Sequence, residues 1–293
     1  MNQRLSTGVP GLDEKLGGGL FPDTMTVLVG STGIGKTQFG LQFLNAVDPN
    51  IEKPGIIYDL TVRGDSQNHE DYAKRLFGRE FLAEDPERRF DHETFFQSDE
   101  TWGDYLRVFT SRNRKVTRRD LDFDQWHDWQ AELSRHLDTT IAMVYHHFSR
   151  GGRRLIIDGI EPVGHKGESI QFELLEYVYH QIIRKEPDWV ARDLFRQFYR
   201  LHADEIQKHS YRKENIACMV LYTAPESTLD AMIERPLDEG DLLATANTII
   251  YLGKIREGTK FRRGMYVSKH RGSVCPDEIL LYEIDDNGLR IVD

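Results

Sequence analysis

Residues 30–37 read Gly-Ser-Thr-Gly-Ile-Gly-Lys-Thr and match the phosphate-binding P-loop pattern at every constrained position. The apolar residues 25–29 come directly before this stretch and predict a short strand. After it, Phe39, Phe43 and Val47 recur at helical spacing, so a helix is expected there. A strand, a glycine-rich turn and a helix are the elements that a P-loop requires in this order.

The residue types in this stretch are those that hold a nucleotide phosphate. Its glycines let the backbone turn so that N–H groups and the start of the helix face phosphate oxygens. Lys36 supplies a positive charge to the phosphates, and the Thr37 hydroxyl can ligate Mg²⁺. The predicted nucleotide-binding residues are Gly30, Ser31, Thr32, Gly33, Ile34, Gly35, Lys36, Thr37 and Gln38.

Composition limits what can be built around this loop. The chain has 293 residues and a net charge of −10, which argues against a generally basic nucleic-acid binder. No apolar run approaches the roughly 18 residues of a membrane helix, and the first residues lack the apolar core of a secretory signal. The only cysteines, Cys218 and Cys275, indicate no disulfide framework, and Cys218 is expected in the core. We therefore expect a cytoplasmic protein with no membrane partner.

Two further apolar stretches end in a carboxylate. Residues 153–158 predict a buried parallel strand whose last residue, Asp158, would hold Mg²⁺ together with Thr37. Residues 55–60 predict a second strand, and Asp59 near its end is our candidate for the base that activates water. The alternative is that Asp59 only caps the turn that follows.

Several motifs outside the P-loop resemble the KaiC-like branch of the RecA superfamily of ATPases. The first are Ser6-Thr7-Gly8, Gly11-Leu12-Asp13 and the Gly-Gly-Gly-Leu turn at residues 17–20. Residues 42–44, Gln-Phe-Leu, continue the likeness after the loop. Lys269-His270-Arg271-Gly272-Ser273 resembles the Lys-x-Arg-Gly-Ser motif of KaiC, and residues 282–290 resemble its terminal hairpin.

The resemblance implies an ATP- and Mg²⁺-dependent ATPase that forms a homo-oligomer, in this family a hexamer. It also implies that Lys269 and Arg271 reach the phosphate of a nucleotide bound to the neighbouring subunit. The implied catalytic residues are Lys36, Asp59, Asp158, Lys269 and Arg271, and the implied metal ligands are Thr37 and Asp158.

The chain departs from the family where the catalytic carboxylate is expected. Family members place glutamate at this position, often two in succession, but here Asp59 is followed by Leu60. The carboxylate is thus shorter by one methylene, and an error of about 1 Å can cost roughly a hundredfold in rate. Gly159 replaces the serine common after the second aspartate, and Glu161 is a conceivable substitute carboxylate. We therefore expect slow hydrolysis.

The expected fold is a single RecA-like α/β domain over residues 1–293. It has a mainly parallel central sheet flanked by helices, with a C-terminal antiparallel extension. Two helical elaborations are expected at about 99–130 and 164–211. The pattern predicts helices at 71–81, 126–148, 169–184 and 189–208, a short strand within 89–98, and a loop at 224–241.

A basic cluster keeps a nucleic-acid function open. It comprises Arg107, Arg112, Arg114, Lys115, Arg118 and Arg119, flanked by Trp102, Trp126 and Trp129. Basic residues beside aromatic ones can follow a phosphate backbone and stack on bases. Acidic residues adjoin the cluster just downstream, which favours a solvated, internally paired segment.

Three functions follow from these features. We favour an ATPase that oligomerises and controls a protein partner through its nucleotide state. The alternatives are a recombinase-like DNA-binding ATPase, and a nucleotide sensor with little hydrolysis. The acidic net charge favours a protein partner over nucleic acid.

Overall fold

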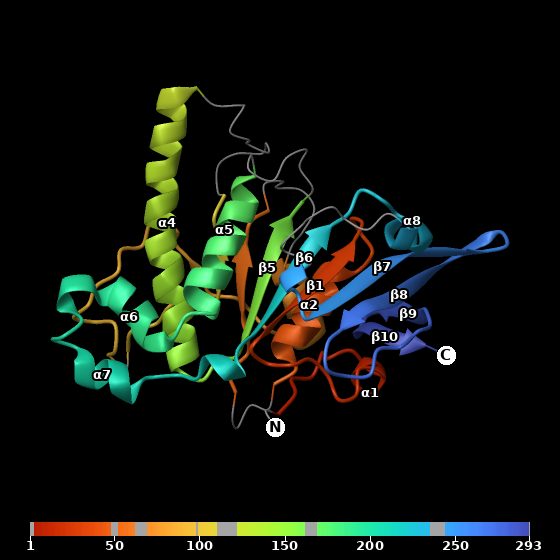
Figure 1. The fold of residues 1–293 in the computed structure, drawn as a ribbon, viewed down its shortest axis with the longest axis horizontal. Coiled ribbons are helices and arrows are strands. Elements are labelled where there is room, and N and C mark those ends of the chain that lie inside the picture. Colours follow the sequence, from red (N-terminus) through yellow and green to blue (C-terminus); the bar gives the residue numbers. More distant parts are fainter. Residues whose placement is uncertain are drawn as a thin grey trace.

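A ten-stranded sheet runs through the protein in the order β10-β9-β8-β7-β1-β6-β5-β2-β4-β3 (Figure 1). The structure is a computed structural model that describes residues 3–47, 52–61, 69–97, 99–109, 122–161, 169–234 and 244–292. The strands are β1 (Thr24–Gly30), β2 (Ile56–Asp59), β3 (Ala83–Glu84), β4 (Tyr105–Arg107), β5 (Arg154–Ile160), β6 (Ala217–Thr223), β7 (Thr248–Glu257), β8 (Lys260–His270), β9 (Leu280–Asp285) and β10 (Gly288–Val292).

The sheet is parallel from β7 through β1, β6, β5, β2 and β4 to β3. Beyond β7 the strands β8, β9 and β10 continue it in antiparallel pairs. This arrangement confirms the predicted mainly parallel α/β sheet with a C-terminal antiparallel extension. In Figure 1 the β7–β8 hairpin extends to the right, away from α4, α6 and α7.

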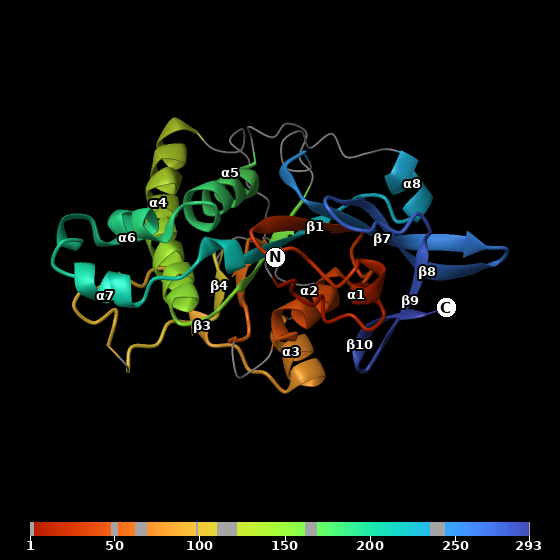
Figure 2. The ribbon, with the colours of Figure 1, turned by 60° about the horizontal axis from the view of Figure 1, so that its bottom comes forward.

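Helices cover both faces of the parallel part of the sheet (Figure 2). The helices α1 (Leu12–Lys15), α2 (Lys36–Asn45) and α3 (His69–Phe77) lie on one face. The opposite face carries α4 (Phe123–Ser149), α5 (Ile170–Val178) with the π-helical turn Tyr179–Ile183, and α8 (Leu229–Glu234). Beyond them, α6 (Pro187–Phe195) packs against α4 and the π-helical turn, and α7 (Ala203–Lys208) packs against α6. None of the helices in the described ranges combines the length and apolar character that crossing a membrane requires.

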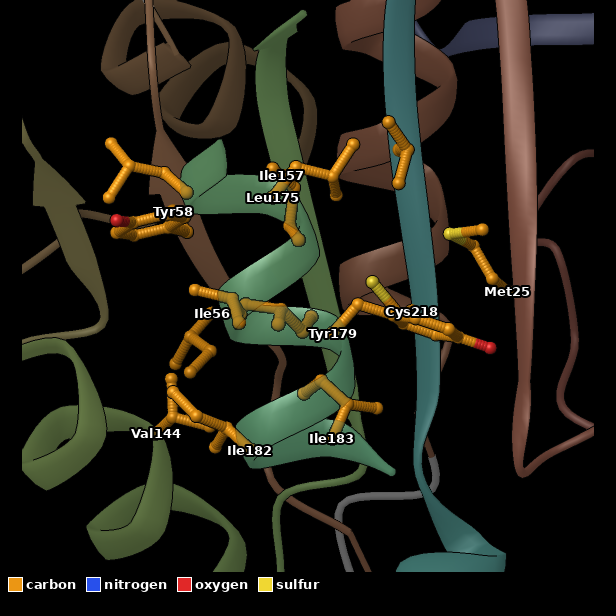
Figure 3. Close-up of a cluster of buried hydrophobic side chains, with 14 of the residues drawn as sticks. Met25, Ile56, Tyr58, Val144, Ile157, Leu175, Tyr179, Ile182, Ile183 and Cys218 are labelled. Carbon is orange, nitrogen blue, oxygen red and sulfur yellow. The ribbon is translucent and has the colours of Figure 1, made fainter. Parts of the chain in front are cut away.

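Alternate residues of the inner strands contribute side chains to two separate hydrophobic cores, one on each face of the sheet. Val27 packs into the core under α4 and α5, while its neighbour Leu28 packs into the core under α2. This alternation follows from the two-residue period of a strand that is covered on both faces. Figure 3 shows the first core, where Leu175 and Tyr179 lie against the strands that carry Ile157 and Cys218. Burial raises the pKa of the Cys218 thiol to about 12, which fits the predicted core role.

Several predicted elements need correction. Residues 71–81 do not form one helix, because α3 begins earlier and ends at Phe77, before Gly78. No strand occurs among the described residues of 89–98; they form turns, because Phe95 and Phe96 pack around Phe195 instead of alternating across a sheet. The elaboration predicted at 99–130 is not helical at its start, where β4 joins the sheet beside β2.

Two corrections lie on the other predicted elaboration and the loop after it. The helix predicted over 189–208 is broken, because Arg196 takes a left-handed backbone with φ of 49° and ends α6. A 3₁₀ turn, Arg196–Phe198, and α7 follow in its place. Residues 224–241, predicted as a loop, contain α8, which packs on β7. The predicted helices at 126–148 and 169–184 agree with α4 and with α5 plus its π-helical turn.

A buried ion pair anchors the start of β5. Arg154 donates to Glu52 at 2.8 Å, and both side chains are at most 5% exposed. The same guanidinium donates to the carbonyl oxygens of Ser6 (2.7 Å) and Phe43 (2.9 Å), so it joins four segments. A buried cation needs such partners because water cannot solvate it.

We predict that Glu52→Ala lowers the free energy of unfolding by about 3–5 kcal/mol, because it leaves the Arg154 charge buried without a counter-charge. Urea titration followed by circular dichroism measures this loss. The matched control is Glu283→Ala, which removes one acid from the exposed pair with Arg290 and should cost less than about 1 kcal/mol. Equal losses in the two variants would contradict an anchoring role for Arg154.

Candidate functional site

The predicted P-loop connects β1 to the N-terminus of α2 at the carboxyl edge of the sheet. Gly35 is the N-cap of α2 with φ of 115°, and a Cβ there would lie 2.6 Å from Ile284 Cδ1. Gly33 has φ of 78°, and a Cβ there would meet no atom within 4 Å. The loop therefore needs glycine for its backbone at both positions, and it leaves open space above Gly33.

Lys36 is held against the loop itself. Its Nζ donates to the carbonyl oxygens of Gly30 (2.8 Å) and Ser31 (3.0 Å), and the residue is 3% exposed. Burial lowers the pKa of Lys36 to about 8, while the negative charges of Asp158 and Glu161 act in the opposite direction. At neutral pH the ammonium group remains charged in a site from which water is largely excluded.

The donor set fits a magnesium-bound phosphate chain. The first turn of α2 has no acidic residue, and Thr37 and Gln38 in that turn are buried. Gln38 Oε1 has no hydrogen-bond partner among the described residues, so a polar group is left for a ligand. Backbone N–H groups at a helix N-terminus, an ammonium group and a threonine hydroxyl together suit phosphate oxygens and Mg²⁺.

The two ends of the chain support the P-loop. The Gln42 amide on α2 donates to Gly8 O (3.0 Å) and Leu289 O (2.8 Å) and accepts from Leu289 N (2.8 Å). The Tyr282 hydroxyl on β9 donates to Ile34 O at 2.8 Å. The motif residues that precede the loop and the terminal hairpin are thus parts of one hydrogen-bonded support.

Asp59 and Asp158 lie side by side at the carboxyl edge. They occupy the same register on the neighbouring strands β2 and β5, and both are at most 1% exposed. Asp158 Oδ1 accepts from Gly159 N at 2.6 Å. Asp59 Oδ1 accepts from Thr61 N at 2.8 Å, and its Oδ2 accepts from the Tyr105 hydroxyl at 2.5 Å. The turn role considered for Asp59 is therefore present alongside its place at the site.

His69, which no sequence pattern singled out, connects the two carboxylates. Its Nε2 lies 2.9 Å from Asp158 Oδ2, and its Nδ1 lies 3.8 Å from Asp59 Oδ2. Burial by itself lowers the pKa of His69, but the hydrogen bond and charge of Asp158, with the charge of Asp59, raise it above the ordinary value. His69 and Asp158 are 89 residues apart, so only the order of strands and helices brings them together.

Gly159 has a structural reason to follow Asp158. Its φ is 91°, and a Cβ would lie 2.3 Å from Thr61 N and 2.4 Å from Leu60 C. The register between β5 and β6 shifts at this point. A serine at this position would clash with the backbone that positions Asp59.

Lys269 and Arg271 lie at the other edge of the sheet. Both donate to the carbonyl oxygen of Ala244, each at 3.1 Å. His270 between them pairs with Thr248, and Thr248 pairs with Thr26, four residues before Gly30. The structure therefore does not bring these two cations to the P-loop of their own chain.

Only one member of the predicted basic cluster lies in the described part of the chain. Arg107 on β4 pairs in register with Asp59, and its charge acts on His69. The other five members lie outside the described residues, so the predicted nucleic-acid surface stays a prediction.

Comparison with known proteins finds relatives of the N-terminal part of the chain. Residues 5–88 match the family model described as ATPase: KaiC. The circadian clock oscillator proteins KaiC of Prochlorococcus marinus (strain MIT 9313) and Parasynechococcus marenigrum (strain WH8102) are each 44% identical to the chain over 52 residues. Each match covers 18% of this chain and only 10% of the relative.

A solved structure of a KaiC-like protein from Pyrococcus horikoshii OT3 aligns over 99% of both chains, with 17% identity and a TM-score of 0.49. The matched segment at residues 5–88 contains the lead-in motifs, the P-loop and the strand that carries Asp59. Over residues 5–88 the chain is therefore similar to the KaiC family of ATPases.

Proposed function

We propose that this protein binds ATP with Mg²⁺, hydrolyses it slowly as a homo-oligomer, and controls a protein partner through its nucleotide state. The observation that carries the proposal is that Lys36 and Asp158 lie at the same, carboxyl edge of the sheet, because β1, which leads into the P-loop, and β5, which carries Asp158, both pair in parallel with β6. Asp158 is the strongest charged influence on the pKa of Lys36, although the two residues lie on different elements. A phosphate-binding cation beside a buried carboxylate is the arrangement that a metal–nucleotide site needs.

Each group has a distinct part in the proposed site. The N–H groups of the loop and Lys36 bind the phosphates, while Thr37 and Asp158 would hold Mg²⁺. When bound, Mg²⁺ neutralises negative charge on the phosphate oxygens. His69 orients the Asp158 carboxylate through its hydrogen bond, as partners of metal-binding carboxylates commonly do.

Asp59 is the proposed base for the attacking water, and its surroundings support slow turnover. Both of its oxygens already accept hydrogen bonds, from Thr61 N and from the Tyr105 hydroxyl. A carboxylate whose two oxygens already accept hydrogen bonds has fewer free lone pairs with which to hold and orient the attacking water. Leu60, where relatives often carry a second glutamate, is fully buried and offers no substitute.

We assign Lys269 and Arg271 to the nucleotide of a neighbouring subunit. They lie about four residues along the strands from Gly30, or about 13 Å, towards the amino edge. That separation is too large for contact with phosphates at their own P-loop, so it supports action across a subunit boundary. A homo-oligomer follows from this assignment, and the resemblance to KaiC favours a hexamer.

The segments outside the matched region support a protein partner. Trp189 on α6 and Leu201, between α6 and α7, are 56% and 72% exposed. Exposed large apolar side chains on neighbouring elements are typical of protein-binding surfaces. Arg107 lies beside Asp59 at the proposed catalytic site, so it does not add to a nucleic-acid surface.

We predict that Lys36→Ala weakens ATP binding by about tenfold to a hundredfold, because it removes a charge-assisted contact worth about 1.5–3 kcal/mol. Calorimetric titration measures the affinity, and circular dichroism checks the fold. Lys74→Ala is the control, since Lys74 is exposed on α3 and pairs only with Glu80 among the described residues. An unchanged affinity for ATP in a folded Lys36→Ala protein would contradict the assignment of residues 30–37 as a phosphate-binding P-loop.

For Asp59→Asn we expect nucleotide binding to persist and turnover to fall by about 10²–10⁴, because a carboxamide cannot accept the proton of water. Phosphate release under saturating ATP gives the rate. Tyr105→Phe is the companion variant: it removes a hydrogen bond to Asp59 but keeps the carboxylate, so turnover should survive. Parent-like turnover in Asp59→Asn would move the base to another group, such as Glu161.

Mixing two inactive variants tests the shared site. A Lys36→Ala subunit still offers its Arg271, and an Arg271→Ala subunit still binds ATP, so we expect activity to reappear in the mixture. Loss of an arginine supplied across an interface can cost about 10³–10⁵ in kcat. Normal hydrolysis by Arg271→Ala alone, or specific activity independent of protein concentration, would contradict the intersubunit assignment.

A further inference from the structure

A cavity of about 220 Å³ lies at the amino edge of the sheet, opposite the P-loop. Segments from four parts of the chain form its wall: the residues before β2, after α3 and before β4, and the last turn of α4. In Figure 1 this is the lower end of α4, while β5 and β6 point to the upper edge. The residues on which the argument rests are Lys53, Arg79, Trp102, His146, His147 and Arg150.

The wall of this cavity is positively charged. It contains three cations and one carboxylate, Asp104, which pairs with Arg79 at 2.7 Å. Lys53 and Arg150 remain as two further positive charges, and Arg150 also donates to Gln97 O at 2.9 Å. The C-terminus of α4 contributes only about half a negative charge, which does not offset them.

The pKa values of the two histidines in the wall are lowered partly by the same positive charges. Burial, together with the charges of Arg150, Lys53 and Arg88, lowers the pKa of His146 to about 3, although a hydrogen bond that the ring donates to the Glu100 backbone acts in the opposite direction. Burial likewise lowers the pKa of His147 to about 3, assisted by the charge of Arg79 and that of Lys53. Both imidazoles are therefore neutral at physiological pH, and the site disfavours cations.

Three residues of the cavity wall each carry a buried nitrogen atom with no hydrogen-bond partner among the described residues: Trp102 Nε1, His146 Nε2 and His147 Nε2, of which the last lies over Gly152. Trp102 is 7% and His146 is 8% exposed, so the lack of a partner is costly at both. The indole N–H can only donate. The hydrogen bond between the His146 ring and the Glu100 backbone favours the protonated ring, so the ring donates it through an N–H. In neutral His146 the other nitrogen, Nε2, is therefore an acceptor.

We infer that this cavity binds inorganic phosphate as hydrogen phosphate. The ligand must be an anion, because the wall is cationic. It must accept hydrogen bonds from Trp102 and the cations, and it must also donate a hydrogen bond to an imidazole nitrogen. Hydrogen phosphate does both, since it carries acceptor oxygens and one O–H. Sulfate and phosphate monoester dianions have similar shape and charge at their oxygens but no O–H, so they leave the imidazole nitrogen unpaired. An acceptor that is buried and unpaired costs binding energy, and this cost provides the selectivity.

The experiment is calorimetric titration of the full chain with sodium phosphate in a phosphate-free buffer at pH 7.5 and constant ionic strength. It is run in the Lys36→Ala background so that the P-loop does not contribute, and repeated with sulfate and with methyl phosphate. We expect saturable binding of phosphate, with sulfate and methyl phosphate at least about tenfold weaker, as one lost hydrogen bond to a charged group predicts. Absence of saturable binding, or equal binding of the three anions, would overturn the inference.

Two added substitutions locate the site. Lys53→Ala removes an exposed cation from the wall, and Trp102→Phe keeps the ring but removes the N–H donor; each should weaken phosphate binding about fivefold or more. Lys74→Ala, which removes a cation outside the cavity, should leave the affinity unchanged. Thermal unfolding of each variant confirms that it is folded. Two results would place any bound phosphate elsewhere. One is an equal change of phosphate affinity in Lys53→Ala and Lys74→Ala; the other is an unchanged affinity in both Lys53→Ala and Trp102→Phe.

Discussion

The burial of two carboxylates side by side is the constraint on which the candidate site depends. Asp59 and Asp158 share one register on neighbouring strands, and both are inaccessible to solvent. Like charges in such a place repel each other and lose their hydration, so each needs hydrogen-bond donors or a cation. The donors come from the Gly159 and Thr61 backbone and the Tyr105 hydroxyl, and His69 lies between the two acids.

These donors explain why elements that are distant in sequence meet here. The strand β4 brings Tyr105 to Asp59, and the first residue of α3 brings His69 to Asp158. The shift in register after Ile157 lets Gly159 pass close to the backbone of Leu60 and Thr61. A chain with two glutamates at positions 59 and 60 would need other partners, because Leu60 is packed in an apolar core. The single Asp59 followed by Leu60 and the presence of His69 are therefore parts of the same local packing arrangement.

The sequence predicted the features that depend on local residue patterns. It missed the features that depend on contacts between segments distant in the chain. The P-loop, the strand before Asp158 and the terminal hairpin each have a signature within about ten residues, and the sheet carries all three as expected. His69 has no such signature, because its partner is 89 residues away. The break at Arg196 was equally hidden, since a left-handed backbone is usually marked by glycine or asparagine and here falls on arginine. The aromatic residues at 90–96 resemble a strand by composition, but they fill the space between α4 and α6.

The support of the P-loop bears on how the proposed intersubunit site could be assembled. Tyr282 and Leu289 of the terminal hairpin hold Ile34 and Gln42, while β9 pairs with β8, the strand that leads to Lys269. The nucleotide loop and the two cations are thus at opposite edges of one hydrogen-bonded sheet. A rigid sheet that carries a nucleotide at one edge and cations at the other can complete a neighbour's site by docking alone. In the proposed oligomer, the geometry between subunits and not a rearrangement within each subunit would then set whether ATP is hydrolysed.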